Sequence, residues 1–480
     1  MLALFAAALL PLWLFKYLPG MDLGNHVAIA SILWKLLTGS DGAVASHYVL
    51  NPQPVPYYVV YAVLAPCVGA FGPYLGLKVA LSALAVATFA GAWRLFRALG
   101  CPWWTPLAGV LFFYGASFFW GFLPSQAGIP FILFGAAGLA SHLAGGSARS
   151  LAVAAVAGLL ASLSHIGLMV PWGAFLVAWL LAAGLRRTWR AGALMALASI
   201  VVPLAPALVS WALGASSPEA RLALGYGTLA ELLDRLRMHL AIFDRGLGRA
   251  AHVAFLISTL VLLVLPSGRS VEPSVRRFVR LALPLQAIAY LATPLAAHVG
   301  GSAIWGLNFR FFPFVEAAFV ALLAGRQLSG RLRLVALAPA LCIALELGAL
   351  LSLGRAFDGT ARLFNPVLAA MRPGATLAVA TRQERWAPAW PPVFTSLHGY
   401  SVATGAGYDS SVFDEKQTPI RHVRSLRGDA RLDRPTVGEF DYLLIQQISA
   451  TDPPIPAPED GELTVTSGPW RLYRRRAPAN

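Results

Sequence analysis

Charged residues are scarce in this sequence. Only 12% of its 480 residues are Asp, Glu, Lys or Arg, whereas 57% are hydrophobic, and the mean hydropathy is +0.65. Soluble domains carry roughly 25% charged residues on average. The composition therefore excludes an ordinary soluble protein and predicts an integral membrane protein. Abundant Ala, Gly, Arg and Leu with only four lysines suggests a bacterial protein, so we expect it in the inner (plasma) membrane.

Cysteines and the common catalytic signatures are also sparse. Cys67, Cys101 and Cys342 lie singly in or beside apolar runs, so neither a disulfide framework nor a cysteine metal site is expected. The sequence contains no P-loop, no Gly-rich dinucleotide fingerprint, no Gly-x-Ser-x-Gly and no His-Glu-x-x-His. These absences argue against ATP hydrolysis and metalloproteolysis. No cofactor is expected, and nothing in the sequence supports a divalent metal.

The positive charge follows a topological pattern. The net charge of +15 comes almost entirely from Arg residues scattered in short clusters between apolar runs. Nucleic acid is excluded as a partner, because the basic residues are not massed on one face. Such clusters belong in cytoplasmic loops of a membrane protein. They are Arg94/Arg97, Arg149, Arg186/Arg187/Arg190, Arg269/Arg276/Arg277/Arg280 and Arg326/Arg331/Arg333.

Residues 1–354 are predicted to form a multi-span membrane domain of about eleven transmembrane helices. A span needs about 20 apolar residues. Residues 19–73 are predicted to be an outer loop, with membrane-parallel helices at 24–37 and 57–71. The run 57–71 could itself be a span, but counting it would move Arg94 and Arg97 outside. The predicted spans are 2–18, 74–93, 103–120, 127–143, two within 151–185, 191–212, 251–266, 280–298, 309–324 and 334–353, with an amphipathic surface stretch at 229–243.

Residues 355–480 are polar, rich in Pro and Arg, and contain no span. With eleven crossings this segment is extracytoplasmic. Its strand-like runs and one helix candidate predict a small α/β domain. The acidic stretch 408–416, near His398 and His422, is expected to be a solvated loop. The strand-like runs are 376–381, 442–446, 463–466 and 470–473, and the helix candidate is 361–371.

An acid and a histidine follow the first span. Asp22 and His26 are four residues apart, so a helix that begins at Asp22 would place both on one face. Asp22 could be the N-cap of that helix. It could also be a general base that deprotonates an acceptor hydroxyl at the outer membrane face. His26 could join Asp22 in catalysis or could be an ordinary polar residue on the helix surface.

Two further outer-side positions carry chemistry-bearing side chains. His165 lies at the tip of the 151–185 hairpin, and ionisable groups at membrane depth often mark function, although a place at the water interface is equally open. Arg310 begins a span, and its planar fork could grip a lipid phosphate or anchor in the headgroups. Asn308 shares its short turn. Glu316 and Glu346, deeper in their spans, need partners that the sequence does not show.

These features together resemble the GT-C superfamily of membrane glycosyltransferases. The resemblance rests on Asp22 just after span 1, on the two loop helices, on the soluble C-terminal part, and on Pro54-Val55-Pro56-Tyr57-Tyr58, which is similar to the Pro-Pro-Leu-Tyr-Tyr type segment of some bacterial members. The usual Asp-Glu pair is here Asp22-Leu23. The resemblance implies an α-helical polytopic fold and a polyprenyl-phosphate sugar as donor. It also implies inverting transfer at the outer face to an envelope glycan, lipid or protein.

Two classes of function follow. In a glycosyltransferase, Asp22 and His26 would be catalytic, and His165, Asn308 and Arg310 would bind substrate, with Arg310 neutralising the leaving phosphate. The alternative is a non-enzymatic membrane protein: a transporter, flippase or envelope scaffold, surrounded by membrane lipids. Transporters often contain inverted repeats, which this sequence does not show. Convergence of Asp22, His165 and Arg310 on one cavity would favour the enzyme.

Overall fold

The computed structural model describes most of the chain. The predicted Pro-rich segment 52–56 and most of the predicted amphipathic stretch 229–243 lie outside the described residues. The described residues are 2–51, 57–203, 205, 223–226, 228, 230–231, 233, 239, 246–265, 271–294, 296–299, 302–326, 332–381, 391–412, 418–423, 426, 432–448 and 453–477.

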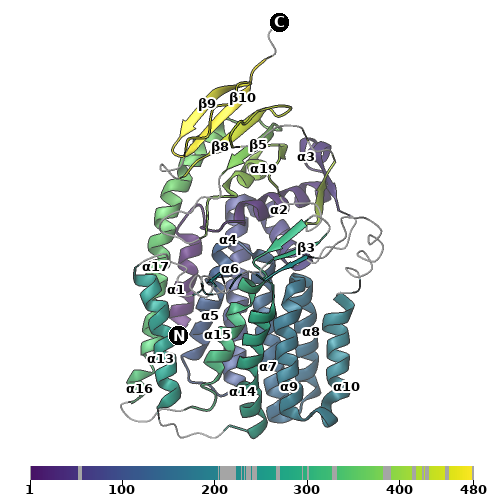
Figure 1. The fold of residues 1–480 in the computed structure, drawn as a ribbon, viewed down its shortest axis with the longest axis vertical. Coiled ribbons are helices and arrows are strands. Elements are labelled where there is room, and N and C mark those ends of the chain that lie inside the picture. Colours follow the sequence, from purple (N-terminus) through teal and green to yellow (C-terminus); the bar gives the residue numbers. More distant parts are fainter. Residues whose placement is uncertain are drawn as a thin grey trace.

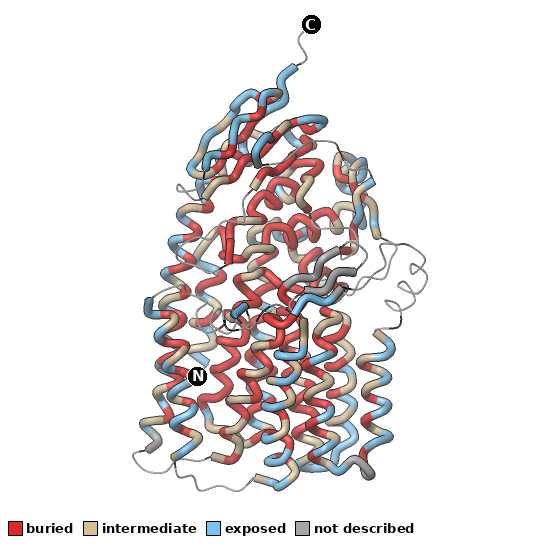
Figure 2. The backbone as a smooth tube through the Cα atoms, in the orientation of Figure 1, coloured by how far each residue is buried: buried red, intermediate tan, exposed pale blue. Residues whose placement is uncertain are grey.

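Long helices run side by side and form the membrane domain, with the C-terminal domain at one end (Figure 1). Buried residues fill the centre of this bundle, and exposed residues cover its outside (Figure 2). Its longer helices are α1 (Leu2–Trp13), α4 (Tyr58–Ala98), α7 (Leu123–Gly145), α8 (Ala148–Ser164), α9 (Met169–Ala183), α10 (Leu185–Ala196), α13 (Leu247–Val264), α14 (Pro273–Ala292), α15 (Phe312–Ala321) and α17 (Ala338–Ala361).

Several apolar segments are broken into short pieces. The predicted span 103–120 is instead η1, α5 and α6, with an extended residue at Gly115. The predicted span 280–298 ends as a helix at Ala292, and residues 296–299 form a strand. The short elements are η1 (Thr105–Leu107), α5 (Ala108–Phe113), α6 (Ala116–Phe119), η2 (Ile166–Leu168), η3 (Leu197–Val201), β2 (Ala223–Gly225), β3 (Ala296–Val299), β4 (Ser302–Trp305), η5 (Asn308–Phe311) and α16 (Leu332–Val335).

Within the described part of the chain, five helical stretches are long and apolar enough to cross a membrane. A membrane-spanning, mostly helical chain is thus supported, whereas the predicted count of eleven spans is not confirmed. The five stretches are Tyr58–Ala98, Leu123–Gly145, Ile166–Ala183, Leu247–Val264 and Ala338–Ala370.

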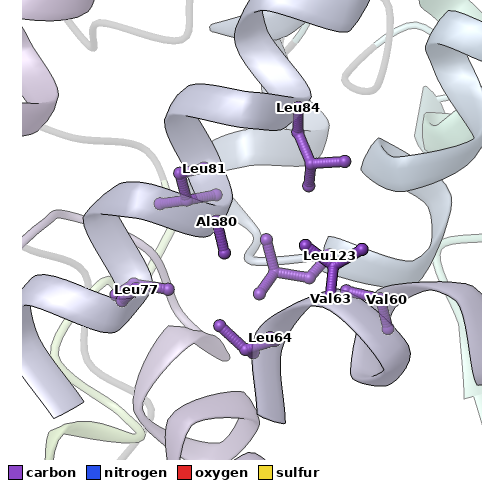
Figure 3. Close-up of a pocket in the computed structure, with 8 residues that line it drawn as sticks. All are labelled: Val60, Val63, Leu64, Leu77, Ala80, Leu81, Leu84 and Leu123. Carbon is purple, nitrogen blue, oxygen red and sulfur yellow. The ribbon is translucent and has the colours of Figure 1, made fainter. Parts of the chain in front are cut away.

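Helix α4 joins two segments that the sequence predicts as separate. It kinks at Gly72, whose φ of 76° and ψ of 172° are outside the helical range. Only glycine adopts such a φ without strain, and Pro73 removes the next backbone donor. Residues 58–71 form the first arm. The two arms and the start of α7 enclose an apolar pocket (Figure 3), which is lined by Val60, Val63, Leu64, Leu77, Ala80, Leu81, Leu84 and Leu123.

The predicted helix over 24–37 is confirmed as α2 (Leu23–Thr38), which ends at the left-handed Gly39. Its first ten residues, 23–32, are all buried, so α2 is enclosed by protein at this end. The short helix α3 (Gly42–His47) and strand β1 (Tyr48–Leu50) follow. Asp41 caps α3, because its side chain accepts hydrogen bonds from the backbone N–H groups of Ala43 and Val44.

The C-terminal domain is built on a five-stranded mixed sheet in the order β6-β5-β8-β10-β9. Strand β5 pairs in parallel with β6 and β8, and β10 pairs in antiparallel with β8 and β9. All four predicted strands are present. The elements are η6 (Arg362–Phe364), α18 (Asn365–Ala370), β5 (Thr376–Thr381), η7 (Leu397–Gly399), α19 (Tyr400–Thr404), β6 (Tyr408–Asp409), β7 (Ile420–His422), β8 (Tyr442–Gln446), β9 (Gly461–Ser467) and β10 (Trp470–Arg475).

The C-terminal domain packs closely on the first loop. Strand β1 pairs in antiparallel with β7, with Tyr48 opposite His422. Segment η7 crosses the start of α2, where a Cβ added at Gly24 would lie 1.9 Å from the carbonyl oxygen of Ser396. Helix α17 continues to Ala361, so the boundary that the sequence predicts at residue 354 falls inside a helix.

Candidate active site

Five chain segments meet around the buried guanidinium of Arg310. They are the starts of α2, α4 and α7, the turn between α8 and α9, and η5. Each contributes a polar or aromatic side chain to one cluster. Because all five are ends or breaks of helices, their side chains and backbone groups can face a common space instead of a neighbouring helix.

Asp22 stands directly before α2. It occupies the N-cap position, but its side chain makes no capping hydrogen bond, which contradicts the reading of Asp22 as a helix cap. The residue is half-buried. Burial raises the pKa of Asp22 to about 7, while the positive charge of Arg310 acts in the opposite direction. A carboxyl with this pKa takes and releases a proton near neutral pH.

The backbone around Asp22 is held from two sides. On the membrane-domain side, the N–H of Met21 donates to the carbonyl of Phe119 at 2.9 Å. On the C-terminal side, the N–H of Ser396 donates to the carbonyl of Met21 at 3.2 Å, and Oγ of Ser396 accepts from the N–H of Gly24 at 3.1 Å. Gly121 packs so closely that a Cβ there would lie 2.5 Å from the backbone nitrogen of Asp22. The position of Asp22 is therefore fixed by contacts distant in sequence.

Arg310 is buried in η5, with 8% of its surface exposed. Its Nη1 donates to Oγ of Ser125 at 3.3 Å and contacts Nε2 of His165. Its guanidinium carbon lies 4.0 Å from the centre of the Phe122 ring, a cation–π distance. The charge of Arg310 also reaches Asp22. Arg310 thus links Asp22 and His165 in one cluster.

His165 is fully buried at the tip of the α8–α9 hairpin. Its Nδ1 accepts from the N–H of Gly167 at 3.0 Å, and its ring stacks on Tyr57 with centroids 5.2 Å apart. Burial and then the charge of Arg310 lower the pKa of His165 well below its usual value. The ring is therefore neutral. Its Nδ1 faces the N–H of Gly167 and its Nε2 faces Nη1 of Arg310, so both ring nitrogens meet protein donors. The guanidinium, which can only donate, is the group of this pair that suits an anion.

His26 and Asn308 are buried in the walls of the cluster. Nδ1 of His26 lies 2.8 Å from the hydroxyl of Tyr61. Burial lowers the pKa of His26 to about 3, despite a hydrogen bond with the backbone of Gly121 that acts in the other direction. His26 therefore stays neutral at physiological pH. Asn308 is 1% exposed, and among the described residues its Oδ1 has no hydrogen-bond partner.

The structure brings His165 into contact with Arg310, whose charge acts on Asp22. Sequence reasoning missed Phe122, Ser125 and Ser396, which join the site through contacts between distant parts of the chain. Tyr57 could have been identified from the sequence, since it belongs to the Pro-Val-Pro-Tyr-Tyr segment that carries the family resemblance. Within the described residues, no group of three or more His, Cys, Asp or Glu side chains has an arrangement that could hold a metal ion.

A second buried cluster explains the two glutamates that lacked partners. His252 of α13 lies between them, with Nε2 3.0 Å from Oε1 of Glu316 and Nδ1 3.4 Å from Oε1 of Glu346. All three side chains are at most 6% exposed. The sequence did not show this partner because His252 is 94 residues from Glu346.

The described part of the acidic stretch, residues 408–412, differs from the solvated loop that we expected, and residues 413–416 lie outside the described residues. Asp409 is 0% exposed, and its carboxylate lies 2.7 Å from Nδ1 of His398. The N–H of Ser411 also donates to Asp409 at 2.9 Å. This pair belongs to the core of the domain.

Comparison with solved structures finds this fold in ArnT from Cupriavidus metallidurans. The crystal structure of ArnT bound to undecaprenyl phosphate is 11% identical in sequence, covers 99% of this chain and 98% of that chain, and gives a TM-score of 0.52. The crystal structure of ArnT in the apo state is also 11% identical in sequence. It covers 98% of this chain and 97% of that chain, with a TM-score of 0.54. No family model and no curated protein matches the sequence. The chain therefore has the GT-C fold that its loop and motif suggested.

Proposed function

We propose that this protein is an inverting glycosyltransferase that transfers a sugar from a polyprenyl-phosphate donor to an acceptor of the cell envelope. The observation that carries the proposal is the meeting of Asp22 with Arg310 and His165 at helix ends. A base and an anion site side by side are what transfer from a phosphate leaving group needs. The structural likeness to ArnT bound to undecaprenyl phosphate supports the same class of donor.

Asp22 acts on the acceptor in this proposal. Its carboxylate takes the proton of the acceptor hydroxyl while that oxygen forms a bond to C1 of the sugar. The bond between C1 and the phosphate oxygen breaks at the same time, and its electron pair leaves with the polyprenyl phosphate. Attack from the face opposite the phosphate inverts the configuration at C1. A pKa of about 7 for Asp22 keeps the carboxylate basic enough to accept a proton near neutral pH.

Arg310 binds the phosphate, and His165 positions Arg310. The fixed guanidinium donates to the phosphate, so it stabilises the charge that develops on the leaving oxygen without having to rearrange. Ser125, the Phe122 ring and Nε2 of His165 contact the guanidinium and fix its direction. Removal of one preorganised donor of this kind typically costs about 100- to 1,000-fold in rate.

The remaining site residues have supporting roles. His26, neutral and hydrogen-bonded to Tyr61, is a positioning residue for the wall beside Asp22. Oδ1 of Asn308 accepts a hydrogen bond from a sugar hydroxyl, which would satisfy an atom left without a partner. We place the C-terminal domain and this site on the extracytoplasmic side of the bacterial plasma membrane.

Transfer of a labelled sugar from a polyprenyl-phosphate donor, with an envelope extract as acceptor, tests the function. Asp22→Asn keeps the size of the side chain and removes the base, so the rate should fall about 100- to 10,000-fold. Asp41→Asn is the matched control, because Asp41 lies in the same loop but caps α3 and pairs with Lys35. It should retain activity. Wild-type rates in Asp22→Asn would remove Asp22 as the base.

A further inference from the structure

A cleft at the end of the membrane domain away from the C-terminal domain gathers three arginines. Arg276 and Arg280 come from the first turns of α14, and Arg326 follows α15. Leu263 near the end of α13 and Leu322 give the cleft apolar walls. Figure 1 shows the ends of these helices at the lower edge of the bundle.

The three arginines come from two clusters that are separate in sequence. Each cluster by itself is explained by the preference of Arg for cytoplasmic loops. That preference spreads charge over loops and does not require side chains to line one cleft. The joining of Arg276 and Arg280 with Arg326, 46 residues after Arg280, therefore needs a further explanation.

No carboxylate neutralises this charge within the described part of the chain. Nη1 of Arg326 donates to the carbonyls of Leu262 and Leu265 at 3.1 and 2.7 Å, which satisfies the end of α13 and leaves its positive charge unpaired. Nη2 of Arg276 is 3.5 Å from the carbonyl of Val271. Arg280 has no ion pair among the described residues.

The acid nearest in sequence is committed elsewhere. The side chain of Glu272 caps α14, since its Oε2 accepts from the N–H of Val275 at 3.0 Å and also contacts Ser274. The cleft thus has a charge of +3 from its own arginines, in an apolar frame, at the start of a helix. Each of these features favours an anion.

The neighbouring surface shows what kind of anion fits. Helix α13, which reaches the cleft at Leu263, exposes large apolar side chains near the same end: Val264 is 76% exposed and Leu260 is 55% exposed. A ligand that matches both the arginine cleft and the apolar face of α13 has an anionic headgroup and hydrocarbon tails. Basic pockets between membrane helices bind such lipids.

We propose that this cleft binds the headgroup phosphate of an anionic glycerophospholipid of the leaflet at that end of the protein. The forks of Arg276 and Arg280 hold the phosphate oxygens, Arg326 adds charge from the opposite wall, and the acyl chains lie along α13. This site is independent of the glycosyltransferase site, which lies at the other end of the bundle.

Native mass spectrometry of the full-length protein in detergent, titrated with phosphatidylglycerol, tests the proposal. Arg276→Gln/Arg280→Gln should weaken binding of the tightest lipid at least about tenfold, because charge-assisted hydrogen bonds are lost. Arg326 is left intact because it caps α13. The matched control is Arg149→Gln/Arg190→Gln, which removes the same charge from α8 and α10, and should change this binding less than about twofold.

Three further arms make the result decisive. Phosphatidylcholine and inorganic phosphate, each at the same concentration, should leave the site unfilled, whereas binding of phosphate alone would show a small-anion site and overturn the proposal. Equal losses in the two double variants would show general charge attraction and would also overturn it. If the double variant does not fold, Arg280→Lys carries the test: it keeps the charge, loses the fork, and should still weaken binding.

Discussion

Two buried groups of charged side chains in this protein differ in how they are built. Asp22, Arg310 and His165 come from helix ends and turns, where a carboxyl with a raised pKa lies near a buried guanidinium. His252, Glu316 and Glu346 come from the interiors of three helices, where one imidazole serves two carboxylates at 3.0 and 3.4 Å. Both groups are buried in the same bundle, and the second links three helices to one another.

The difference teaches which intramembrane charges to regard as functional. Both groups come from the ionisable residues that stand out in an apolar sequence. Side chains inside helices face neighbouring helices and find protein partners there. Side chains at helix ends lie beside unsatisfied backbone groups and open space. We therefore interpret the three-helix cluster as stabilising, and we propose the cluster of Asp22, Arg310 and His165 as the functional site.

Removal of His252 should give the largest effect on stability. His252→Ala leaves two buried carboxylates facing each other, and loss of one partner of a buried pair costs about 3–5 kcal/mol. Thermal unfolding in detergent should show a large decrease in melting temperature. The triple variant His252→Leu/Glu316→Gln/Glu346→Gln removes all the charges together and should recover much of the loss. An unchanged melting temperature in His252→Ala would mean that the cluster does not stabilise the packing of the three helices.

Replacement of Arg310 should lower the transfer rate strongly and the stability little, the reverse of what we expect for His252. Arg310→Gln removes the donors for the leaving phosphate, so transfer should slow about 100- to 1,000-fold, while the melting temperature changes little. Arg310→Lys keeps the charge but loses the fork and should recover only part of the rate. If Arg310→Gln unfolds the protein as readily as His252→Ala, then Arg310 is structural and the contrast between the two clusters is lost.

Removal of the contact between Ser396 of the C-terminal domain and the backbone beside Asp22 should reduce the transfer rate by a smaller factor. Ser396→Ala removes the hydroxyl that accepts from the N–H of Gly24 and donates to the carbonyl of Met21. Asp22 is then held less firmly, and the loss of two hydrogen bonds at about 1 kcal/mol each is worth about thirtyfold at most. We expect kcat to fall with KM nearly unchanged. Thr395→Ala is the control, since among the described residues its hydroxyl bonds only to the carbonyl of Pro392, at 2.8 Å. Equal rates for both variants would separate the C-terminal domain from catalysis.

Local sequence patterns predicted the elements whose limits are set locally. The strands 376–381 and 442–446 match β5 and β8, because alternating or continuous apolar runs between turns define buried strands. The helix over 24–37 matches α2 to within a residue at each end. The number of spans could not be predicted, since the segment 103–120 breaks at Gly115 and α4 continues through Gly72.

The site could be predicted only in part. Asp22, His165 and Arg310 stood out because each is a rare ionisable residue at the edge of an apolar run. Their common location, and the parts played by Ser125 and Ser396, depend on contacts 185 and 372 residues apart. The partner of Glu316 and Glu346 was hidden for the same reason. A local pattern shows which residues need partners, and only the folded chain shows which partners they find.

The pH dependence of transfer tests the central claim most directly. If Asp22 is the base and burial raises its pKa to about 7, only the carboxylate form is active, and below pH 7 the fraction in that form falls about tenfold per pH unit. The value of kcat/KM should therefore rise from pH 5 and level off above about pH 7, and Arg310→Gln should move this midpoint upward. A profile that is flat from pH 5 to pH 8 would contradict the account.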